Sequence, residues 1–398
     1  MWEMVRLSEL IEKPKSGEWG IEGEKIKVIR TTNFTNEGSI DFTNVVYRDI
    51  SNEKIAKKKL HKGDIIIEKS GGSPSQPVGR VVFFNEEEDY LYNNFTSLLR
   101  PKKKRTVEKY IFWFLFYYYK SNKVLKFQNK TTGIINLKLN DYVDSINVPL
   151  PPLAIQQQIV TILDKADRLR QLDKTIEEKY DALAQSIFID MFGDPVKNEK
   201  GWEVKKLGEF FSMLVDVGSN GGNDWVSANI NMKDDEDFAI MVRTVNLSNN
   251  DFCKNLKFVT ETTYNLFKKT KVYGGEIIMN KIGSAGEYWI MPNLERPVSL
   301  GLNQLMFSFS ELNEVFFYHY FKTSFGRSLI KSKLRGAITK SITKGALKEL
   351  DIYYPPIELQ HEFAKKIAII NQMKEQEMKG EELFQALLQK AFKGELVS

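Results

Sequence analysis

Three polar residues around one short apolar run have the types that a metal-dependent nuclease uses. Asp64, Glu68 and Lys69 flank three consecutive isoleucines, and paired carboxylates beside a lysine can bind Mg²⁺ and orient an attacking water. A similar stretch later in the chain ends in Asn280-Lys281, where an amide replaces the second carboxylate. The pattern therefore gives little support to metal chemistry.

Other catalytic patterns are also missing. The three histidines are scattered, and Cys253 is the only cysteine, so neither a cysteine zinc site nor a disulfide framework is expected. Two Pro-Pro pairs occur in Leu-Pro-Pro-Leu and Tyr-Pro-Pro-Ile, whereas amino-methyltransferases place Asn, Asp or Ser before the prolines and an aromatic residue after them. There is no GxxxxGK[ST] loop. We expect no catalytic site, metal or cofactor on this chain.

The polar residues fit the reading of DNA better. Base edges are read by Arg, Lys, Asn, Gln, Ser or Thr, and phosphates are bound by basic residues. Two glycine-containing loops follow apolar runs, and a dense basic run lies at 102–105. Basic residues also recur at matching places of the two halves, at 120–130 and 327–340. The candidate contacts are Arg30, Lys69, Ser70, Gly71, Ser73, Gln76, Arg80, Lys102, Lys103, Lys104 and Lys130 in the first half, and Arg243, Lys281, Ser284, Lys333, Arg335, Lys340 and Ser341 in the second. The alternatives are solvated hairpin tips for the loops and, for Arg30 and Arg243, internal bracing of the fold.

These segments recur because the sequence contains an internal repeat. The stretch WEMVRLSEL at 2–10 matches WEVKKLGEF at 202–210, and GDIIIEKSGG at 63–72 matches GEIIMNKIGS at 275–284. Likewise TTGIINLKLNDYVDSINVPLPP matches RGAITKSITKGALKELDIYYPP, and LAQSIFIDMF matches LFQALLQKAF. Several matches in one order indicate a duplicated unit. The unit begins with a mixed region of strands and helices, at 1–150 and 194–352, and ends with a long helix, at 151–193 and 353–398.

Each long helix follows a double proline and carries a glutamine near its first turn. Proline suits the point where a strand ends and a helix begins, and the amide of Gln156 or Gln360 can satisfy an orphan backbone group there. Apolar residues then recur at spacings of three, four or seven, as in paired helices. We expect an antiparallel coiled coil whose contacts are Ile159, Ile162, Ala166, Leu169, Ile176 and Leu183 of the first helix and Phe363, Ile367, Ile370, Met373, Phe384 and Leu387 of the second. The alternative is that each helix lies on its own globular region.

The composition is that of a folded protein, with 42% hydrophobic and 27% charged residues among 398 and a formal net charge of +5. This mild positive charge permits a polyanionic partner without requiring one. The most apolar stretch, at 110–119, is too short to span a bilayer and predicts a buried aromatic helix. A single cysteine and an N-terminus without an apolar signal core suggest a reducing, cytoplasmic setting.

The order of these motifs resembles the DNA-specificity subunit of type I restriction–modification enzymes. The resemblance covers essentially the whole chain, with Ala154 standing where that family commonly has Glu. It implies an α+β fold with two target-recognition domains, each reading half of a split DNA sequence, separated by an antiparallel coiled coil that sets their spacing. It also implies two adenine methyltransferase partners that carry S-adenosylmethionine, and a restriction subunit that uses ATP.

Two other functions are compatible with parts of the sequence pattern. One is a self-contained nuclease or methyltransferase, against which the missing loops argue. The other is an architectural or adaptor protein that uses its helices for docking and does not read sequence.

Overall fold

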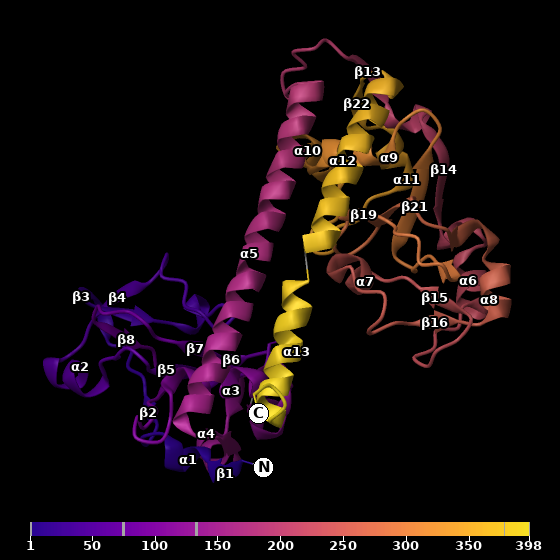
Figure 1. Ribbon diagram of the computed structural model, residues 1–398. Helices are drawn as coiled ribbons and strands as arrows, with labels where there is room; N and C mark the ends of the chain where they lie inside the picture. The colour runs from indigo at the N-terminus through magenta and orange to yellow at the C-terminus, as the bar shows by residue number, and fades with distance from the viewer. Residues whose placement is uncertain (1, 74–75, 132–133, 378, 398) are drawn as a thin grey trace. The chain divides into compact units, whose positions relative to one another are not determined.

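The computed structural model describes residues 2–73, 76–131, 134–377 and 379–397, and the α+β class predicted from the sequence is confirmed (Figure 1). The chain folds as two compact units. Unit 1 comprises residues 1–174 together with 377–398, and unit 2 comprises residues 175–376. Each unit is therefore assembled from a globular region and two segments of long helix.

Unit 1 contains three small sheets and a short two-stranded ladder. The ladder pairs β1 (Glu3–Arg6) with β12 (Asn147–Leu150). The first sheet has the strand order β2 (Lys15–Ser16), β9 (Thr96–Leu99), β5 (Ile65–Glu68), β7 (Val81–Phe83). The second has the order β4 (Val46–Asp49), β3 (Ile21–Ile29), β8 (Tyr90–Tyr92). The third has the order β10 (Gln128–Thr131), β11 (Ile134–Leu137), β6 (Ser70–Gly72). Its helices are α1 (Leu7–Leu10), α2 (Asn52–Lys58), α3 (Glu108–Lys120), α4 (Leu139–Ser145), the first part of α5 (Leu153–Phe192) and α13 (Gly380–Lys393).

Unit 2 repeats much of this plan. Here β13 (Glu203–Lys206) pairs with β22 (Asp351–Tyr354) as β1 pairs with β12. Two four-stranded sheets have the orders β14 (Phe211–Asp216), β21 (Gln304–Phe309), β18 (Ile277–Asn280), β19 (Tyr288–Ile290) and β16 (Phe258–Val259), β15 (Ala239–Met241), β20 (Val298–Ser299), β17 (Lys271–Val272). The helices are α6 (Asn223–Asn229), α7 (Thr244–Asn249), α8 (Glu261–Leu266), α9 (Glu314–Lys322), α10 (Ser324–Lys333), α11 (Lys344–Lys348), the second part of α5 and α12 (Ile357–Glu377).

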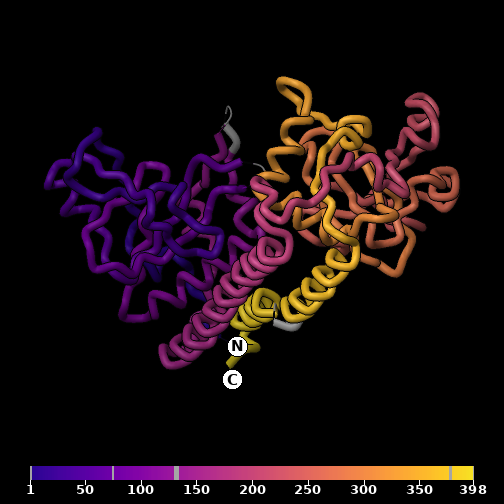
Figure 2. Tube along the Cα trace, turned by 90° about the horizontal axis from the view of Figure 1, so that it is seen from above, coloured from indigo at the N-terminus to yellow at the C-terminus, as the bar shows by residue number. Residues whose placement is uncertain are grey.

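The aromatic helix predicted at 110–119 is α3, which is buried in the core of unit 1. Its rings contact side chains from the far end of the chain, because Trp113 lies 5.5 Å from Phe384 and Phe114 lies 5.4 Å from Phe392, measured between ring centroids. The N- and C-terminal segments both belong to this unit and lie near each other (Figure 2). Gly394 lies beside the ring of Trp2. The C-terminal helix of the second repeat thus completes the core that the first repeat begins.

The two glutamines after the double prolines have one structural role, as predicted. The side-chain oxygen of Gln156 accepts the backbone N–H of Val107, the N-cap residue of α3, at 2.8 Å, while its amide donates to the Pro151 carbonyl. Gln360 makes the same contacts with Asn313, the N-cap residue of α9, at 2.9 Å, and with Pro355. Both amides are fully buried. Each glutamine therefore fixes the start of a long helix to the start of a shorter one.

Within each unit the paired helical segments run antiparallel. In unit 1 the N–H of Gly380, at the start of α13, donates to Asp173 of α5 at 2.9 Å, and the later end of α13 leads to Leu396, which shares a cavity with Gln157 near the start of α5. Because α13 packs in the core of unit 1, the alternative that each long helix lies only on its own repeat is wrong.

In unit 2 the second part of α5 pairs with α12. Lys374 contacts Asp181 at 2.5 Å, and the ring of Phe363 lies 5.5 Å from that of Phe188. Residue numbers rise along α5 as they fall along α12, so this pair is also antiparallel.

The helical contacts predicted from spacing are only partly buried. Ile159, Ala166, Phe363, Ile367, Ile370 and Phe384 are buried, and Ile162, Ile176 and Leu387 are intermediate. Leu169, Leu183 and Met373 are a correction, because they are 48%, 46% and 45% exposed. The apolar stripe is wider than one helix–helix contact, so spacing alone does not identify which of its edges is covered.

The second long helix, predicted as one helix at 353–398, is a further correction, because the structure has two helices there, α12 and α13. Gly380 opens α13 where the two backbones approach closely. A Cβ atom at this position would lie 2.3 Å from Asp173 Oδ2 and 3.1 Å from the Cα of Arg170. A residue with a side chain would force these helices apart.

Candidate nucleic-acid interface

The segment after β5, called the glycine loop here, includes the short strand β6 (Ser70–Gly72), where a loop was predicted, and combines a lysine, a hydroxyl and an open glycine. Lys69 is partly buried and its ammonium donates to the hydroxyl of Ser16. Burial lowers the pKa of Lys69, and the charge of nearby Lys58 lowers it further. Ser70 donates to Asn136 at 2.5 Å, while Gly71, at φ +97°, has open space where a Cβ would be. A ligand backbone can approach this point closely.

Two further candidates follow in the same loop. Backbone hydrogen bonds of 2.9 and 3.1 Å between Ser73 and Gln76 close a turn, and the side chain of Gln76 is exposed. The prediction that Arg80 offers its guanidinium to DNA is corrected. Arg80 is 8% exposed, pairs with the buried Glu68 at 2.8 Å, and also donates to the carbonyl of Phe34. Its donors hold the fold together, because a buried guanidinium needs partners for its charge.

The matching loop of unit 2 has a different electrostatic environment. Lys281 donates to Asp216 at 2.9 Å, and Lys344 donates to the other oxygen of the same carboxylate at 3.0 Å. Burial raises the pKa of Asp216, but hydrogen bonds from the two lysines outweigh burial and lower it to about 2. Two cations thus share one anion, whereas the ammonium of the equivalent Lys69 donates to the neutral Ser16 and has no ion-pair partner among the residues described.

The two loops nevertheless share one backbone framework. The N–H of Leu137 donates to the carbonyl of Lys69 at 2.8 Å, and the N–H of Ile342 donates to the carbonyl of Lys281 at 2.9 Å. In both units, the segment before the last strand is therefore attached to the loop after the buried central strand. Because the framework is common and the side chains differ, the arrangement suits two readers of different sequences.

The basic segment of unit 2 is brought to its glycine loop by this framework. Arg335 and Ser341 exchange backbone hydrogen bonds of 2.9 and 2.8 Å, and the N–H of Gly283 donates to the carbonyl of Lys340. Ser284 is exposed beside them. Among the described residues, Lys333, Arg335 and Lys340 have no ion-pair partner, so their charges remain available to an anion. In unit 1 the side chain of Lys130, at the matching place, lies outside the described part of the chain.

Arg30 and Arg243 brace the fold. Arg30 donates to the carbonyl of Asn44 at 2.7 Å, and Arg243 donates to the carbonyl of Asn255. The backbone N–H of each arginine also donates to a side-chain oxygen, that of Asn33 for Arg30 and that of Asn246 for Arg243. Of the two alternatives left open by the sequence, internal bracing describes both arginines in this structure.

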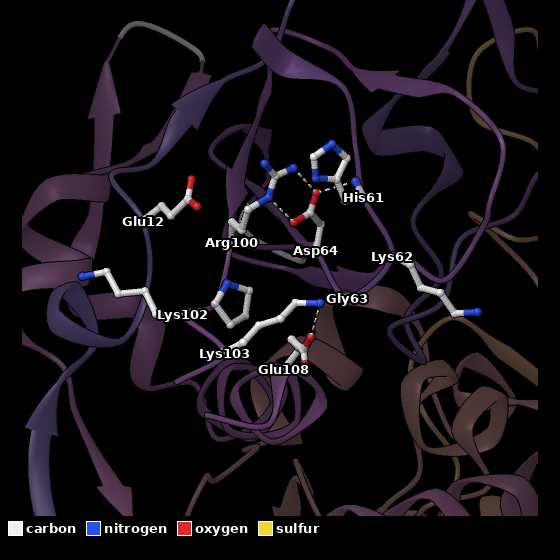
Figure 3. A pocket seen from close by; sticks show the side chains of 10 residues that line it. Glu12, His61, Lys62, Gly63, Asp64, Arg100, Lys102, Lys103 and Glu108 are labelled. Atoms are coloured by element: carbon white, nitrogen blue, oxygen red, sulfur yellow. Dashed lines mark hydrogen bonds and ion pairs between the residues drawn. The ribbon is translucent and has the colours of Figure 1, made fainter. Parts of the chain in front are cut away.

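The run from Lys102 to Arg105 lies away from the glycine loop, beside a cavity of about 270 Å³ (Figure 3). Lys102 donates to the carbonyl of Glu9, and Lys103 pairs with Glu108 at 3.1 Å. Lys104 is exposed and, within the residues described, has no ion-pair partner. The cavity also contains the buried Asp64, so it mixes charges of both signs.

The carboxylates that first suggested a nuclease are engaged in ion pairs. Asp64 binds Arg100 at 2.6 Å, and Glu68 binds Arg80. The described residues contain no group of three or more His, Cys, Asp or Glu side chains placed to hold a metal ion. The same part of the chain contains no helix long and apolar enough to cross a membrane.

Two residues of this site were not predicted. Asp216 and Lys344 lie 128 positions apart. Asp216 is outside the recurring stretches, and Lys344 is inside one of them, at a position where the first repeat has Asn140. The one available signal was the offset of 200 between Ser16 and Asp216, which the match of the two N-terminal stretches would have placed at equivalent positions.

Comparison with known proteins places the chain in a family. The model of the type I restriction modification DNA specificity domain matches residues 1–179 and again 199–379. A putative type I restriction enzyme MjaX specificity subunit of Methanocaldococcus jannaschii is 25% identical over 406 residues, covering 96% of this chain and 89% of that protein. The HindI specificity subunit of Haemophilus influenzae is 27% identical over 177 residues, 41% of this chain and 36% of the relative.

The fold agrees with these matches. The crystal structure of a type I restriction–modification S subunit from M. genitalium superposes with a TM-score of 0.53 at 15% identity, covering 98% of this chain and 96% of that one. Specificity subunits are non-catalytic, in agreement with the expectation that this chain is not an enzyme. The chain belongs to the type I restriction modification DNA specificity family and carries two copies of its domain.

Proposed function

We propose that each domain of this specificity subunit reads one half of a split DNA target, and that the long helices set the distance between the halves. Specificity subunits of type I systems bind DNA and assemble with the other subunits. The observation that carries the proposal is the shared framework around Lys69 and Lys281, which presents different side chains in the two units. A common scaffold with different loops is what two distinct readings require.

The exposed apolar residues of the helix pairs support docking of two adenine methyltransferase subunits. Unit 1 exposes Leu169 and Leu172 on α5 and Leu383 on α13, each between 47% and 48%. Unit 2 exposes Leu183 on α5, and Ile369 and Met373 on α12, between 45% and 55%. Such residues on a paired helix fit a further helix from a partner. One patch per unit favours two copies of the partner.

The chemistry then belongs to the partners. S-adenosylmethionine is held by the methyltransferase subunits and ATP by a restriction subunit, and this chain binds neither. The functions of a self-contained enzyme and of an adaptor that does not read sequence are not favoured, because the family is one of specificity subunits.

Methylation mapping tests the proposal. Methylated adenines are located across a genome that expresses the complete locus, first with the natural chain and then with four residues inserted in α5 near Lys174. We expect a two-part motif whose gap widens by about two base pairs, because four residues add about 6 Å of helix. A four-residue insertion in the loop at 197–200, outside the helix, serves as the control. An unchanged gap would exclude the helix as the spacer, and methylation without any two-part motif would exclude the function itself.

A further inference from the structure

One apolar side chain of unit 2 is almost completely exposed. Ile338 is 99% accessible to solvent, more than any other large hydrophobic residue among those described. It lies at the tip of the loop that Arg335 and Ser341 close. Exposure of a whole isoleucine is unfavourable in water, so an isoleucine at such a tip is a candidate for contact with a ligand.

The loop is held in place at its base. Arg335 and Ser341 exchange two backbone hydrogen bonds, and Gly283 donates to the carbonyl of Lys340. Gly336 has φ +101°, and a Cβ there would lie 2.2 Å from the carbonyl oxygen of Thr339. This close turn, which requires glycine, directs the following residues outward. Ile338 is thus presented by a closed loop that is anchored to the glycine loop of the same unit.

The surroundings of Ile338 are basic. Lys333, Arg335 and Lys340 flank it, and none has an ion-pair partner within the described part of the chain. An apolar tip among unneutralised cations is unsuited to an apolar protein groove, but it matches DNA, which combines phosphates with apolar groups in its grooves. The positive charge of the loop thus favours DNA as the partner, and the isoleucine favours contact with an apolar group in a DNA groove.

The first repeat offers a related feature. Ile134, at the start of β11, is 47% exposed in the segment that the sequence repeat matches to the loop of Ile338. Both copies of this segment therefore expose an isoleucine.

We propose that Ile338 is a specificity-determining residue that contacts the C5 methyl group of a thymine in the half-site read by the second domain. The proposal rests on the proposed function of DNA reading. Thymine methyl is the apolar group that base edges present in the major groove, and it distinguishes A·T from the other pairs at one position. Arg335 and Lys340 bind the adjacent phosphates and hold the loop in the groove.

The test uses the complete complex with its methyltransferase subunits. The natural chain is first mapped for its two-part methylation motif; the absence of any such motif would refute the proposed function before Ile338 is examined. Ile338→Ser is then compared with Val204→Ser, which replaces another exposed aliphatic residue of the unit, 53% accessible, on β13. We expect Ile338→Ser to lose the thymine preference at one position of the second half-site only, and Val204→Ser to leave the motif unchanged.

Binding to duplexes identifies the group that is contacted. Each thymine of the second half-site is replaced in turn by uracil, which lacks the methyl group. We expect one replacement to weaken binding of the natural complex by about fourfold, the value of one buried methyl group, and to have no effect on the Ile338→Ser complex. The proposal is overturned if Ile338→Ser keeps the natural motif and the natural uracil sensitivity, or if it weakens binding while the uracil sensitivity persists.

Discussion

The carboxylate of Asp216 neutralises two lysines beside the glycine loop of the second domain, and its removal should change how the protein binds DNA. In Asp216→Ser, Lys281 and Lys344 lose ion pairs of 2.9 and 3.0 Å, and the formal positive charge rises by one. The new side chain is the one that the first domain already has, at Ser16. The variant therefore gives Lys281 the neutral partner that Lys69 has in the first domain, and it also releases Lys344.

The magnitude follows from counterion release. Each lysine that binds a phosphate makes the plot of log binding constant against log salt steeper by about 0.9, so two freed lysines should add about 1.8 to the slope. The gain applies to any sequence, so non-specific binding at low salt should rise and discrimination between the target and other DNA should fall. Titrations of the assembled complex at several salt concentrations, with target and scrambled duplexes, measure both quantities.

A matched control separates local from general charge effects. Asp351→Ser removes an acidic partner of Lys206 at 2.8 Å, with the same change in net charge but on β22. We expect Asp351→Ser to leave the slope within about 0.3 of the natural value. If Asp216→Ser and Asp351→Ser give equal slopes, the reasoning about the loop is refuted.

Asp216 also makes stability depend on pH. Its pKa in the folded protein, about 2, is below the ordinary value of 3.8, so its stabilisation is present above about pH 4 and is lost as the pH falls through 2. Solvent screening limits this contribution to about 1 kcal/mol. The free energy of unfolding of Asp216→Ser should lack this acid-dependent step.

Three further substitutions test the packing of the units. Glu68→Ala leaves the guanidinium of Arg80 buried without its anion and should lower the free energy of unfolding by about 3–5 kcal/mol, as measured by denaturant titration. Gly380→Ala introduces a Cβ against Asp173 and should cost about 1–2 kcal/mol despite the better helix propensity of alanine, which a shift in the denaturant midpoint would report. Burial, and then the charge of Lys322, lower the pKa of His319 to about 4, so stability should fall by up to about 3 kcal/mol between pH 6.5 and 4, and His319→Phe should remove that dependence.

Controls exist for each of these changes. Glu53→Ala breaks an exposed ion pair with Lys57 and should cost under about 0.5 kcal/mol; an equal loss from Glu68→Ala would mean that the buried pair is unimportant. Gly201→Ala changes a glycine with open space around it, though at a φ of +68°, and involves no helix contact. His361→Asn alters an exposed histidine and should keep the natural pH profile.

Local patterns in the sequence predicted the repeated architecture well. The double prolines with Gln156 and Gln360 identified the helix starts, and the aromatic run identified α3, because these features depend on residues close in sequence or on composition. The same reasoning placed Arg80 at a DNA surface, where the structure buries it against Glu68. An arginine's environment depends on which acidic residue the fold brings to it, and no spacing rule contains that information.

The helix contacts show the same limit in another form. Spacing identified an apolar stripe on α5, but burial of Ile159 and exposure of Leu169 depend on what packs beside each turn. The pairing of Asp216 with Lys344 is likewise created by the fold alone, since 128 residues separate them. The recurring motifs predicted the positions of the two glycine loops in the sequence. Which charged residues surround each loop could be seen only in the three-dimensional structure.

The discontinuous build of unit 1 has a consequence for synthesis on the ribosome. Unit 2 is one continuous stretch, so it can fold as soon as residue 376 has emerged. Unit 1 must wait for Phe384, Leu388 and Phe392, which close the aromatic surface of α3 and are translated only after all of unit 2. Until then a nascent chain holds an uncovered patch of tryptophan and phenylalanine. Premature termination after residue 376 would therefore yield a product with a folded second unit and a first unit that exposes hydrophobic surface. Such a product would be bound by chaperones and degraded by proteases.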